Sequence, residues 1–279
     1  MNRKDKLRKI EELRKSGYSY REILKKVRVS KRDITKISKK TNFSREGKIR
    51  YFTKVTGIVR PIKKQKSKLT PEKTRIIGNL LFDGSVYKTT GYHHTISYVN
   101  SSKYLVLKLC RDIEKVYGVK PFTYEEKGKT LIYYRILCKS KEMYLDLLRY
   151  SPSYSTSSKL VKVPYQIMNG PKEIKINFLR TFWDNEGSIS KEGKLRGSSN
   201  SKKVISQLNK IHKDLKFKTK IYQDNSKTST SYILSISKNM DNLKRFYKYQ
   251  LFTDSIVTNG KFKGLNKINV VKYFLPKRS

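Results

Sequence analysis

Apolar residues near the start of the chain recur three or four positions apart, which is the spacing of one face of a helix. Ile10 and Leu13 mark a first stretch of this kind, Ile23 and Val27 mark a second, and Ile34 begins a third. Turn-forming and polar residues separate the three stretches. The pattern therefore predicts three short helices.

Polar residues at the starts of the second and third helices have N-cap spacing. Ser19 is followed by Glu22, as in a capping box, and Ser30 is followed by Asp33 in the same way. The outer side of the third helix carries basic and polar residues, namely Lys31, Arg32, Thr35, Lys36 and Lys39. Two capped helices joined by a short turn, the second one basic, are typical of a DNA-binding helix-turn-helix module, and the alternative is a generic basic helical bundle. We predict the helix-turn-helix, with these five side chains contacting DNA.

The next segment interrupts the helical pattern. Gly57 and Pro61 break the periodicity, and residues 63–68 form a charge run without apolar partners. We predict a helix-turn-helix domain over residues 1–45 and a basic linker over residues 46–69.

From residue 70 onward the order of predicted elements repeats. Each half runs helix–strand–strand–helix–strand–strand–helix, over residues 70–155 and again over residues 156–279. The helices are expected at 70–83, 102–117 and 141–149, and then at 173–186, 202–215 and 240–249. The strands are expected at 85–87, 95–99, 122–125 and 131–137, and then at 188–189, 195–198, 218–223 and 231–237. Asn100 precedes one middle helix as Asn200 precedes the other. The repeat predicts an α+β fold with an antiparallel sheet in each half, preceded by a small all-α domain.

The first helix of each repeat is largely apolar and ends in an acid followed by glycine. These pairs are Asp83-Gly84 and Glu186-Gly187. Glycine after a helix predicts a C-cap, but a carboxylate at the negative end of the helix dipole is unfavourable. If the two helices pack side by side in the same direction, the two carboxylates meet. Such a pair needs a cation, and oxygen ligands select a hard one such as Mg²⁺.

The net charge of the chain indicates which class of molecule it binds. Lys and Arg number 65 against 22 Asp and Glu, so the formal net charge is +43. Neutralising this charge on a polyanion releases counterions, which favours nucleic acid. No run approaches the roughly 20 apolar residues of a membrane helix, and the charged N-terminus leads into no apolar signal core. Two Cys and three His make neither a disulfide framework nor a zinc set, so we expect a reducing cytoplasm.

The two acidic helix ends resemble a known pair of motifs. Ile76–Gly84, Ile-Ile-Gly-Asn-Leu-Leu-Phe-Asp-Gly, and Leu179–Gly187, Leu-Arg-Thr-Phe-Trp-Asp-Asn-Glu-Gly, are similar to the motifs of two-motif LAGLIDADG homing endonucleases. The segment beginning Lys162-Val-Pro-Tyr-Gln-Ile is similar to the one that introduces the second motif in intein-type and archaeal members. Thr181 replaces the motif glycine that is present as Gly78, and the second acid is Glu instead of Asp. The resemblance covers about residues 70–279.

The resemblance implies a pseudo-twofold monomer whose two sheets form a saddle on the major groove of double-stranded DNA. It implies Mg²⁺, with Mn²⁺ also possible, held by Asp83 and Glu186 together with Gly84 and Gly187. It also implies a catalytic lysine at Lys162, with Lys261 or Lys263 as its counterpart. The remaining basic residues that we expect to contact DNA are Lys103, Arg135, Lys218, Lys220, Lys261 and Lys263.

The leading hypothesis is a sequence-specific, divalent-metal-dependent double-strand DNA endonuclease that acts on a long asymmetric site. Two alternatives stay open. One is a transcriptional regulator that binds DNA on the same fold without cleaving it, and the other is an RNA maturase. Retention of both motif acids favours the endonuclease, because a regulator gains nothing from two unpaired carboxylates at helix ends.

Overall fold

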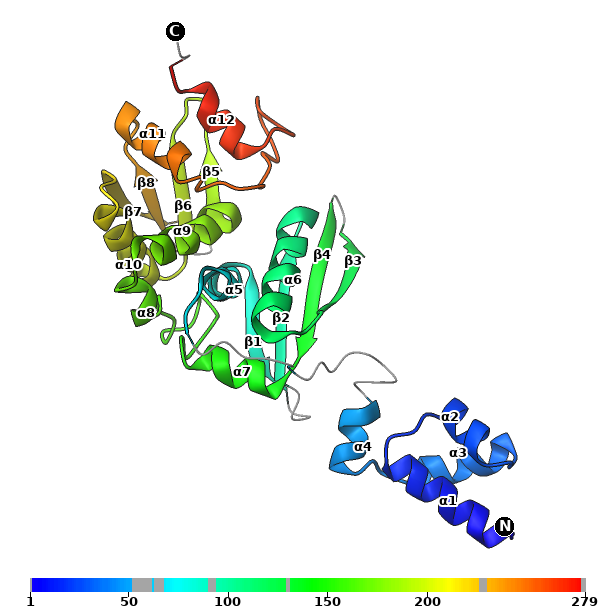
Figure 1. The fold of residues 1–279 in the computed structure, drawn as a ribbon. Coiled ribbons are helices and arrows are strands. Elements are labelled where there is room, and N and C mark those ends of the chain that lie inside the picture. The colour runs from blue at the N-terminus through cyan, green and yellow to red at the C-terminus, as the bar shows by residue number, and fades with distance from the viewer. Residues whose placement is uncertain are drawn as a thin grey trace. The chain divides into compact units, whose positions relative to one another are not determined.

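The structure, a computed structural model, describes residues 2–51, 62, 68–89, 94–128, 131–225 and 230–276 (Figure 1). The chain divides into two compact units, Met1–Pro61 and Ile62–Ser279. Most of the predicted linker, including residues 63–67 of its charge run, lies outside the described residues.

The first unit is helical. Its helices are α1 Arg3–Lys15, α2 Tyr20–Lys26, α3 Lys31–Lys40 and α4 Arg45–Arg50. The five apolar residues that predicted the first three helices form the buried core of this unit. Both sides of the predicted capping box are present, because the Ser19 N–H donates to Glu22 Oε2 at 2.7 Å and the Glu22 N–H donates to Ser19 Oγ at 3.3 Å. The three predicted helices are therefore confirmed.

Helix α4 belongs to the first unit, although it begins the segment predicted as a linker. Its Arg50 pairs with Glu22 at 2.6 Å and donates to the Gly17 carbonyl oxygen at 2.7 Å. Gly17 has a positive φ, and a Cβ there would lie 2.0 Å from the Gly47 carbonyl oxygen. Two glycines thus let α4 approach the turn between α1 and α2 closely.

The second unit contains both repeats, and each follows the predicted αββαββα order. The first consists of α5 Pro71–Phe82, β1 Gly84–Lys88, β2 His94–Asn100, α6 Lys103–Tyr117, β3 Phe122–Lys127, β4 Ile132–Lys139 and α7 Lys141–Leu148. The second consists of α9 Lys172–Glu186, β5 Gly187–Ile189, β6 Leu195–Ser199, α10 Lys202–Asp214, β7 Thr219–Asn225, β8 Thr230–Ile236 and α11 Met240–Lys248. Two short helices, α8 Tyr165–Met168 and α12 Lys267–Tyr273, were not predicted.

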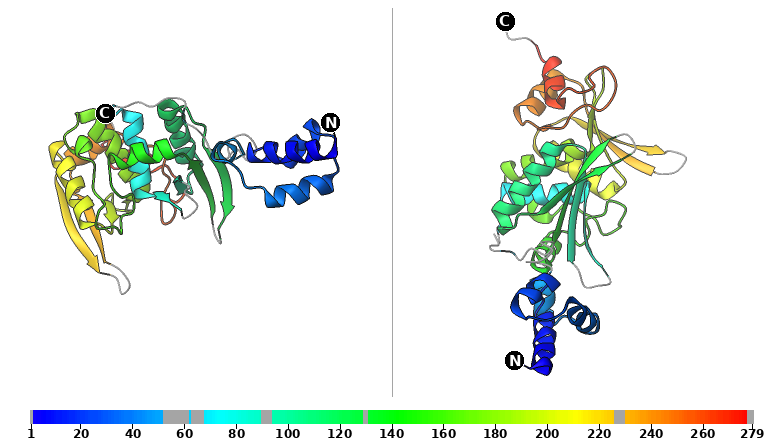
Figure 2. Two further views of the ribbon diagram at one scale, coloured as in Figure 1. Left: turned by 90° about the horizontal axis from the view of Figure 1, so that it is seen from below. Right: turned by 90° about the vertical axis from the view of Figure 1, so that its right-hand side faces the viewer.

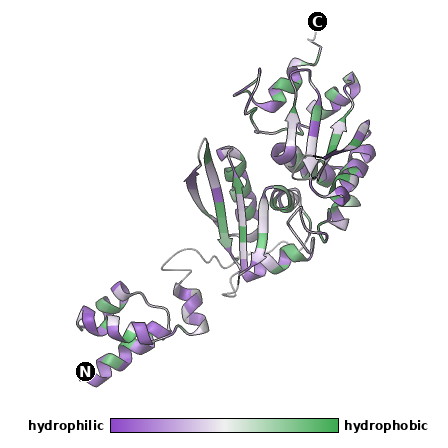
Figure 3. Cartoon of the chain, turned by 180° about the vertical axis from the view of Figure 1, so that it is seen from behind, coloured by the Kyte–Doolittle hydropathy of each residue, from purple (hydrophilic) through white to green (hydrophobic). Residues whose placement is uncertain are grey.

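Each repeat contributes one four-stranded antiparallel sheet. The strand orders are β1-β2-β4-β3 and β5-β6-β8-β7, so equivalent strands occupy equivalent places. In Figure 2 the strands of both sheets extend along one side of this unit, and helices cover the other side. Hydrophilic and hydrophobic positions lie next to one another along the strands (Figure 3). This alternation gives each sheet one face toward the core and one outer face.

A single hydrophobic core runs through both repeats, with α5 and α9 at its centre. Phe82 of α5 packs against Phe178 and Phe182 of α9, with ring centroids 5.6 and 5.4 Å apart. Trp183 is completely buried and lies edge-on to Phe246 and Phe252 of the second repeat. The two repeats are therefore joined by shared apolar packing.

A buried histidine makes the stability of this core sensitive to acid. His212 of α10 is fully buried; its Nε2 accepts from Trp183 Nε1 at 3.0 Å, and its Nδ1 lies 2.8 Å from the Leu208 carbonyl oxygen. Burial lowers the pKa of His212 to about 4, from 6.5. The unfolded chain therefore binds this proton more tightly than the folded chain does.

We expect stability to be independent of His212 above pH about 6.5 and to fall by about 3 kcal/mol in total as the pH drops from there to about 4. Urea unfolding between pH 7 and pH 4 measures this loss. A His212→Gln variant is less stable throughout but lacks the histidine's contribution to the pH dependence. Equal pH slopes for the two proteins would show that His212 is not the acid-sensitive group.

Candidate active site

Helices α5 and α9 lie side by side in the same direction. Near their N-terminal ends, Arg75 Nη1 donates to Asn177 Oδ1 at 2.8 Å. Near their C-terminal ends, Asn185 Nδ2 donates to Asn79 Oδ1 at 2.9 Å. The second contact lies further toward the C-terminus in both helices than the first. The two helices are therefore parallel, and their C-terminal ends lie next to each other.

A glycine allows the close approach of the two helices. A Cβ placed on Gly78 would lie 1.9 Å from Thr181 Oγ1. Thr181 is itself buried, and its hydroxyl donates to the Phe178 carbonyl oxygen of its own helix at 2.7 Å. A small residue opposite a glycine therefore suffices for close packing, although Thr181 replaces the second motif glycine.

The parallel arrangement brings Asp83 and Glu186 together. Asp83 is the C-cap residue of α5, and Glu186 is the last residue of α9. Burial raises the pKa of Asp83 to about 6, against the opposing effects of a hydrogen bond from Asn100 and the nearby Lys267 ammonium. Burial and then repulsion from Asp83 raise the pKa of Glu186 to about 8. The sequence expectation that the two acids meet agrees with this geometry.

Gly187 is the C-cap residue of α9, as the sequence predicts, whereas the C-cap of α5 is Asp83 itself and Gly84 follows it. Gly84 and Gly187 are the first residues of β1 and β5, and Gly187 is extended, with φ −85° and ψ 145°. A Cβ on Gly84 would lie 2.6 Å from Leu80 Cα, and one on Gly187 would lie 2.4 Å from the Trp183 carbonyl oxygen. Glycine is needed here because the strand leaves the helix end with no room for a side chain.

The surroundings of the two acids differ. Asn100 Nδ2 donates to Asp83 Oδ2 at 2.9 Å, and Asn100 Oδ1 accepts from the Ser102 N–H at 2.8 Å. In the second repeat Ser199 Oγ accepts from the Ser201 N–H at 3.3 Å, so Ser199 occupies the place of Asn100. The sequence alignment of Asn100 with Asn200 was wrong by one residue. Asp83 therefore has an amide donor where the second repeat has only a hydroxyl.

A lysine that the sequence did not indicate lies beside the acids. Lys267, at the start of α12, donates from Nζ to the Gly187 carbonyl oxygen at 2.7 Å. Its Nζ is also 5.3 Å from the centre of the Phe252 ring. Burial lowers the pKa of Lys267, and the charges of Asp184 and Asp83 oppose this effect. No sequence pattern predicted α12, so only the fold reveals this residue.

Asp184 holds the segment that carries Lys267. Its carboxylate is buried and accepts from the Thr253 N–H at 2.8 Å, from Thr253 Oγ1 at 2.6 Å and from Ser255 Oγ at 3.1 Å. The Lys267 N–H in turn donates to the Ser255 carbonyl oxygen at 2.9 Å. Asp184 thus positions the start of α12.

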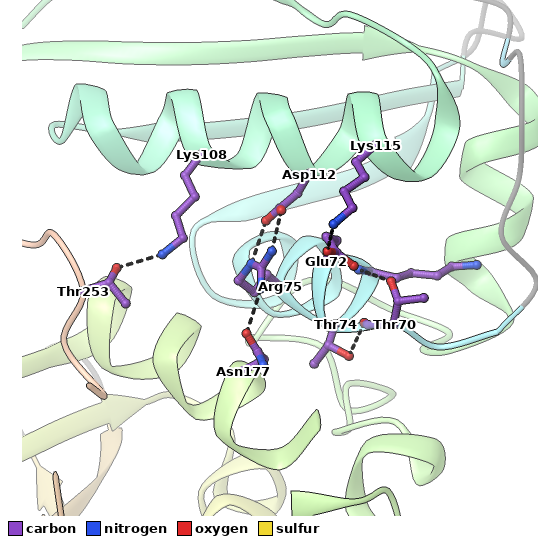
Figure 4. A network of polar contacts seen from close by, with 10 residues as sticks. Thr70, Glu72, Thr74, Arg75, Lys108, Asp112, Lys115, Asn177 and Thr253 are labelled. Carbon is purple, nitrogen blue, oxygen red and sulfur yellow. Dashed lines mark hydrogen bonds and ion pairs between the residues drawn. The ribbon is translucent and has the colours of Figure 1, made fainter. Parts of the chain in front are cut away.

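Figure 4 shows the polar contacts that lock the motif helices to their neighbours. Arg75 of α5 donates from Nε and Nη2 to the two carboxylate oxygens of Asp112 on α6, at 2.8 and 2.6 Å. Lys108 of α6 donates to Thr253 at 3.2 Å. Arg75 therefore joins α5 to both α6 and α9 by side-chain hydrogen bonds. It lies in the N-terminal half of α5, whereas Asp83 follows the C-terminal end of that helix.

The other lysines suggested by sequence do not gather at the acids. Lys162, Lys261 and Lys263 are exposed, and no contact of their side chains with either acid is found in the part of the chain that the structure describes. The candidate DNA-contact residues fall into separate places. Lys31, Arg32, Thr35, Lys36 and Lys39 lie on α3, Lys103 is at the start of α6, Arg135 is on β4, and Lys218 and Lys220 are at β7. All are exposed except Thr35 and Arg135, which are half-buried.

Comparison with known proteins identifies the fold and one domain. Residues 173–249 match the family model of the LAGLIDADG-like domain. The homing endonuclease I-ApeI of Aeropyrum pernix is 27% identical over 119 residues, which are 41% of this chain and 51% of that protein. The tRNA-splicing ligase RtcB of Pyrococcus furiosus is 30% identical over 137 residues, which are 44% of this chain and 14% of that protein. The chain thus spans only part of the length of either relative.

The chain also resembles a solved structure. The crystal structure of I-DmoI in complex with DNA and Ca is similar with a TM-score of 0.50 and 16% identity, over 73% of this chain and 97% of that one. The class of protein is therefore an α+β protein with the LAGLIDADG homing endonuclease fold. Within this class, residues 173–249 of the second repeat are similar to the LAGLIDADG-like domain.

Proposed function

We propose that the chain is a sequence-specific, divalent-metal-dependent DNA endonuclease that acts as a monomer. One observation carries the proposal, namely the two half-buried carboxylates that α5 and α9 bring together. Their partial burial raises the pKa of both, and the charge of Asp83 raises that of Glu186 further. Stability alone does not favour such a pair. The formal charge of +43 supplies an affinity for the polyanionic substrate.

The donor set fits a hard divalent cation. Asp83 and Glu186 offer carboxylate oxygens and Gly84 offers a carbonyl oxygen, which are ligands that suit Mg²⁺ or Mn²⁺. The Gly187 carbonyl oxygen, which the sequence also suggested as a ligand, instead accepts from Lys267 Nζ at 2.7 Å. Among the described residues no group of three or more His, Cys, Asp or Glu side chains forms a metal site, so the remaining ligands would be water and phosphate oxygens. Such a cation would neutralise the two acids and the charge that develops on the phosphate.

The chain's own groups orient the site. The Asn100 amide fixes one oxygen of Asp83, and the Asn185 amide bridges α9 to Asn79 of α5. Lys267 holds the Gly187 carbonyl oxygen and presents a cation beside Asp83. We assign Lys267, in place of Lys162, Lys261 or Lys263, as the lysine that supports phosphate cleavage.

Replacing Lys267 tests this assignment. Lys267→Met is expected to lower the cleavage rate roughly 100- to 1000-fold, because a preorganised positive charge near the phosphate is lost. DNA affinity is expected to change little. Lys272→Met, which removes an exposed lysine of the same helix, serves as the matched control and is expected to cleave normally. Equal rates for the two variants would contradict the assignment.

The first unit is proposed to bind DNA next to the cleaved site through α3. In the full chain, changing Lys31, Arg32, Lys36 and Lys39 to Gln is expected to lower the slope of log affinity against log salt by about 0.9 for each phosphate that is no longer neutralised. The matched control changes Arg3, Lys4, Arg8 and Lys9 of α1, which removes the same charge. Identical slopes for the two variants would show that α3 does not contact phosphates.

The proposed function is tested by incubating the full chain with Mg²⁺ and duplex DNA that carries the sequence flanking its own gene. A discrete double-strand cut that requires both the metal and the motif acids is the expected result. Specific binding without any cut, with Mg²⁺ or Mn²⁺, would instead identify a regulator on the same fold. No membrane is expected as a partner, and no described helix is long and apolar enough to cross one.

A further inference from the structure

The outer face of the first sheet has an arginine at its centre. Arg135 lies on β4, an inner strand of the sheet. Its neighbour Ile136 and the cross-strand residue Tyr98 are each 1% exposed and point into the core. Alternation along the strand therefore directs Arg135 to the opposite, outer face, together with its cross-strand partners Val99 on β2 and Tyr124 on β3.

Most of the hydrogen-bonding capacity of Arg135 is already used. Its Nε and Nη2 donate to Glu126 Oε2 at 3.2 and 2.8 Å, and its Nη1 donates to Ser97 Oγ at 3.4 Å. Both acceptors lie on the same outer face, since alternate residues of a strand share a face. A guanidinium has five N–H groups, so one remains on each terminal nitrogen. Glu126 and Ser97 thus hold the guanidinium in place and leave a pair of neighbouring donors.

A pair of neighbouring donors matches one base edge in the major groove. Guanine presents two acceptors there, O6 and N7, whereas adenine presents an acceptor beside a donor, thymine a single acceptor beside a methyl group, and cytosine a donor. An arginine whose orientation is fixed loses little side-chain entropy when it makes this bidentate contact. We propose that Arg135, positioned by Glu126 and Ser97, reads one guanine of the target DNA. This inference rests on the proposed function.

The second sheet lacks this arginine at the equivalent place. Gly84 pairs with Tyr98 as Gly187 pairs with Gly197, which sets the correspondence between the two sheets. By that register Tyr222 corresponds to Tyr124, Asp224 to Glu126, and Ile233 to Arg135. Ile233 has no donor and suits the methyl group of thymine. The contact proposed for Arg135 therefore has no counterpart at this place in the second sheet. That sheet instead carries Arg196 at the place of Ser97, with its guanidinium 5.8 Å from the centre of the Tyr222 ring.

Selection from a pool of random-sequence duplexes tests the inference. The full chain is used in Ca²⁺, so that binding is measured independently of cleavage. The wild-type protein is expected to select guanine at one position by roughly 5- to 150-fold over other bases. Arg135→Ala is expected to remove this preference at that position and to leave the other positions unchanged. Arg135→Gln is expected to shift the preference there to adenine, because Gln pairs with the adenine edge.

Two further variants complete the design. Glu126→Gln keeps Arg135 but loosens it, so the guanine preference is expected to weaken at the same position. Ile233→Ala is the matched control on the second sheet and is expected to leave the guanine preference intact. Uniformly weaker binding of Arg135→Ala to all sequences would mean that Arg135 contacts a phosphate, and would overturn the inference.

The failure of this inference and that of the proposed function are distinguishable. If the selected duplex is cut in Mg²⁺ and Arg135→Ala selects the same bases as the wild-type protein, only the guanine contact is wrong. If the guanine preference follows Arg135 but no duplex is cut, the chain is a specific DNA-binding protein without nuclease activity. If the wild-type chain selects no sequence at all, both are wrong.

Discussion

Asp83→Asn and Glu186→Gln are each expected to lower double-strand cleavage by at least about 1000-fold, because loss of a metal-holding carboxylate removes several kcal/mol of transition-state stabilisation. DNA affinity is expected to stay equal or to rise, since each change removes a negative charge that faces the phosphates. The measurements are single-turnover cleavage in Mg²⁺ and binding in Ca²⁺. We expect Ca²⁺ to support DNA binding but little cleavage, because its looser coordination positions water poorly.

Glu192→Gln is the matched control for the acid variants. Glu192 is also followed by a glycine, but it is exposed and lies in the turn between β5 and β6. Its variant is expected to cleave at the wild-type rate. If Asp83→Asn and Glu186→Gln cleave as fast as Glu192→Gln, the two motif acids are not the active site.

Arg75→Met is expected to lower the free energy of unfolding by about 3–5 kcal/mol, because it leaves the Asp112 carboxylate buried without its partner. The Asp112 side chain is 7% exposed, and that of Arg75 is 18% exposed. Burial raises the pKa of Asp112 despite the neighbouring guanidinium, which shows how costly this charge is without Arg75. Urea unfolding at pH 7 measures the loss.

Lys115→Met is the control for the Arg75 variant. It breaks a pair with Glu72 in which the lysine side chain is 60% exposed, so the expected loss is below about 1 kcal/mol. The double variant Arg75→Met with Asp112→Leu is expected to recover much of the stability of Arg75→Met, because no unpaired charge remains buried. Equal losses for Arg75→Met and Lys115→Met would show that the buried pair does not hold α5 to α6.

Asp83 and Glu186, the two acids of the proposed site, could be selected from the sequence. Asp83 and Glu186 end equivalent helices, so the repeat alone singled them out from other acid–glycine pairs such as Glu192 with Gly193. The element order was predictable for a similar reason, because apolar spacing is a local property of each segment. The helix of the first unit that lies beyond Thr41 was missed, since α4 is only six residues long and its packing depends on the contact of Gly47 with Gly17.

The sequence by itself determined the elements, their repetition, the positive charge and the two acids. Each of these properties depends on composition or on residues that are close together in the chain. Only the tertiary structure decided which residues surround the acids. Lys267 contacts Gly187 from a helix that lies 80 residues further along the chain. Ser199, and not Asn200, takes the place of Asn100, because the two repeats are aligned by the register of their strands and not by the similarity of their sequences. The outer-face cluster of Arg135 and Glu126 likewise joins two strands through a cross-strand register. Such contacts arise from packing between segments distant in the chain, and local patterns carry no information about them.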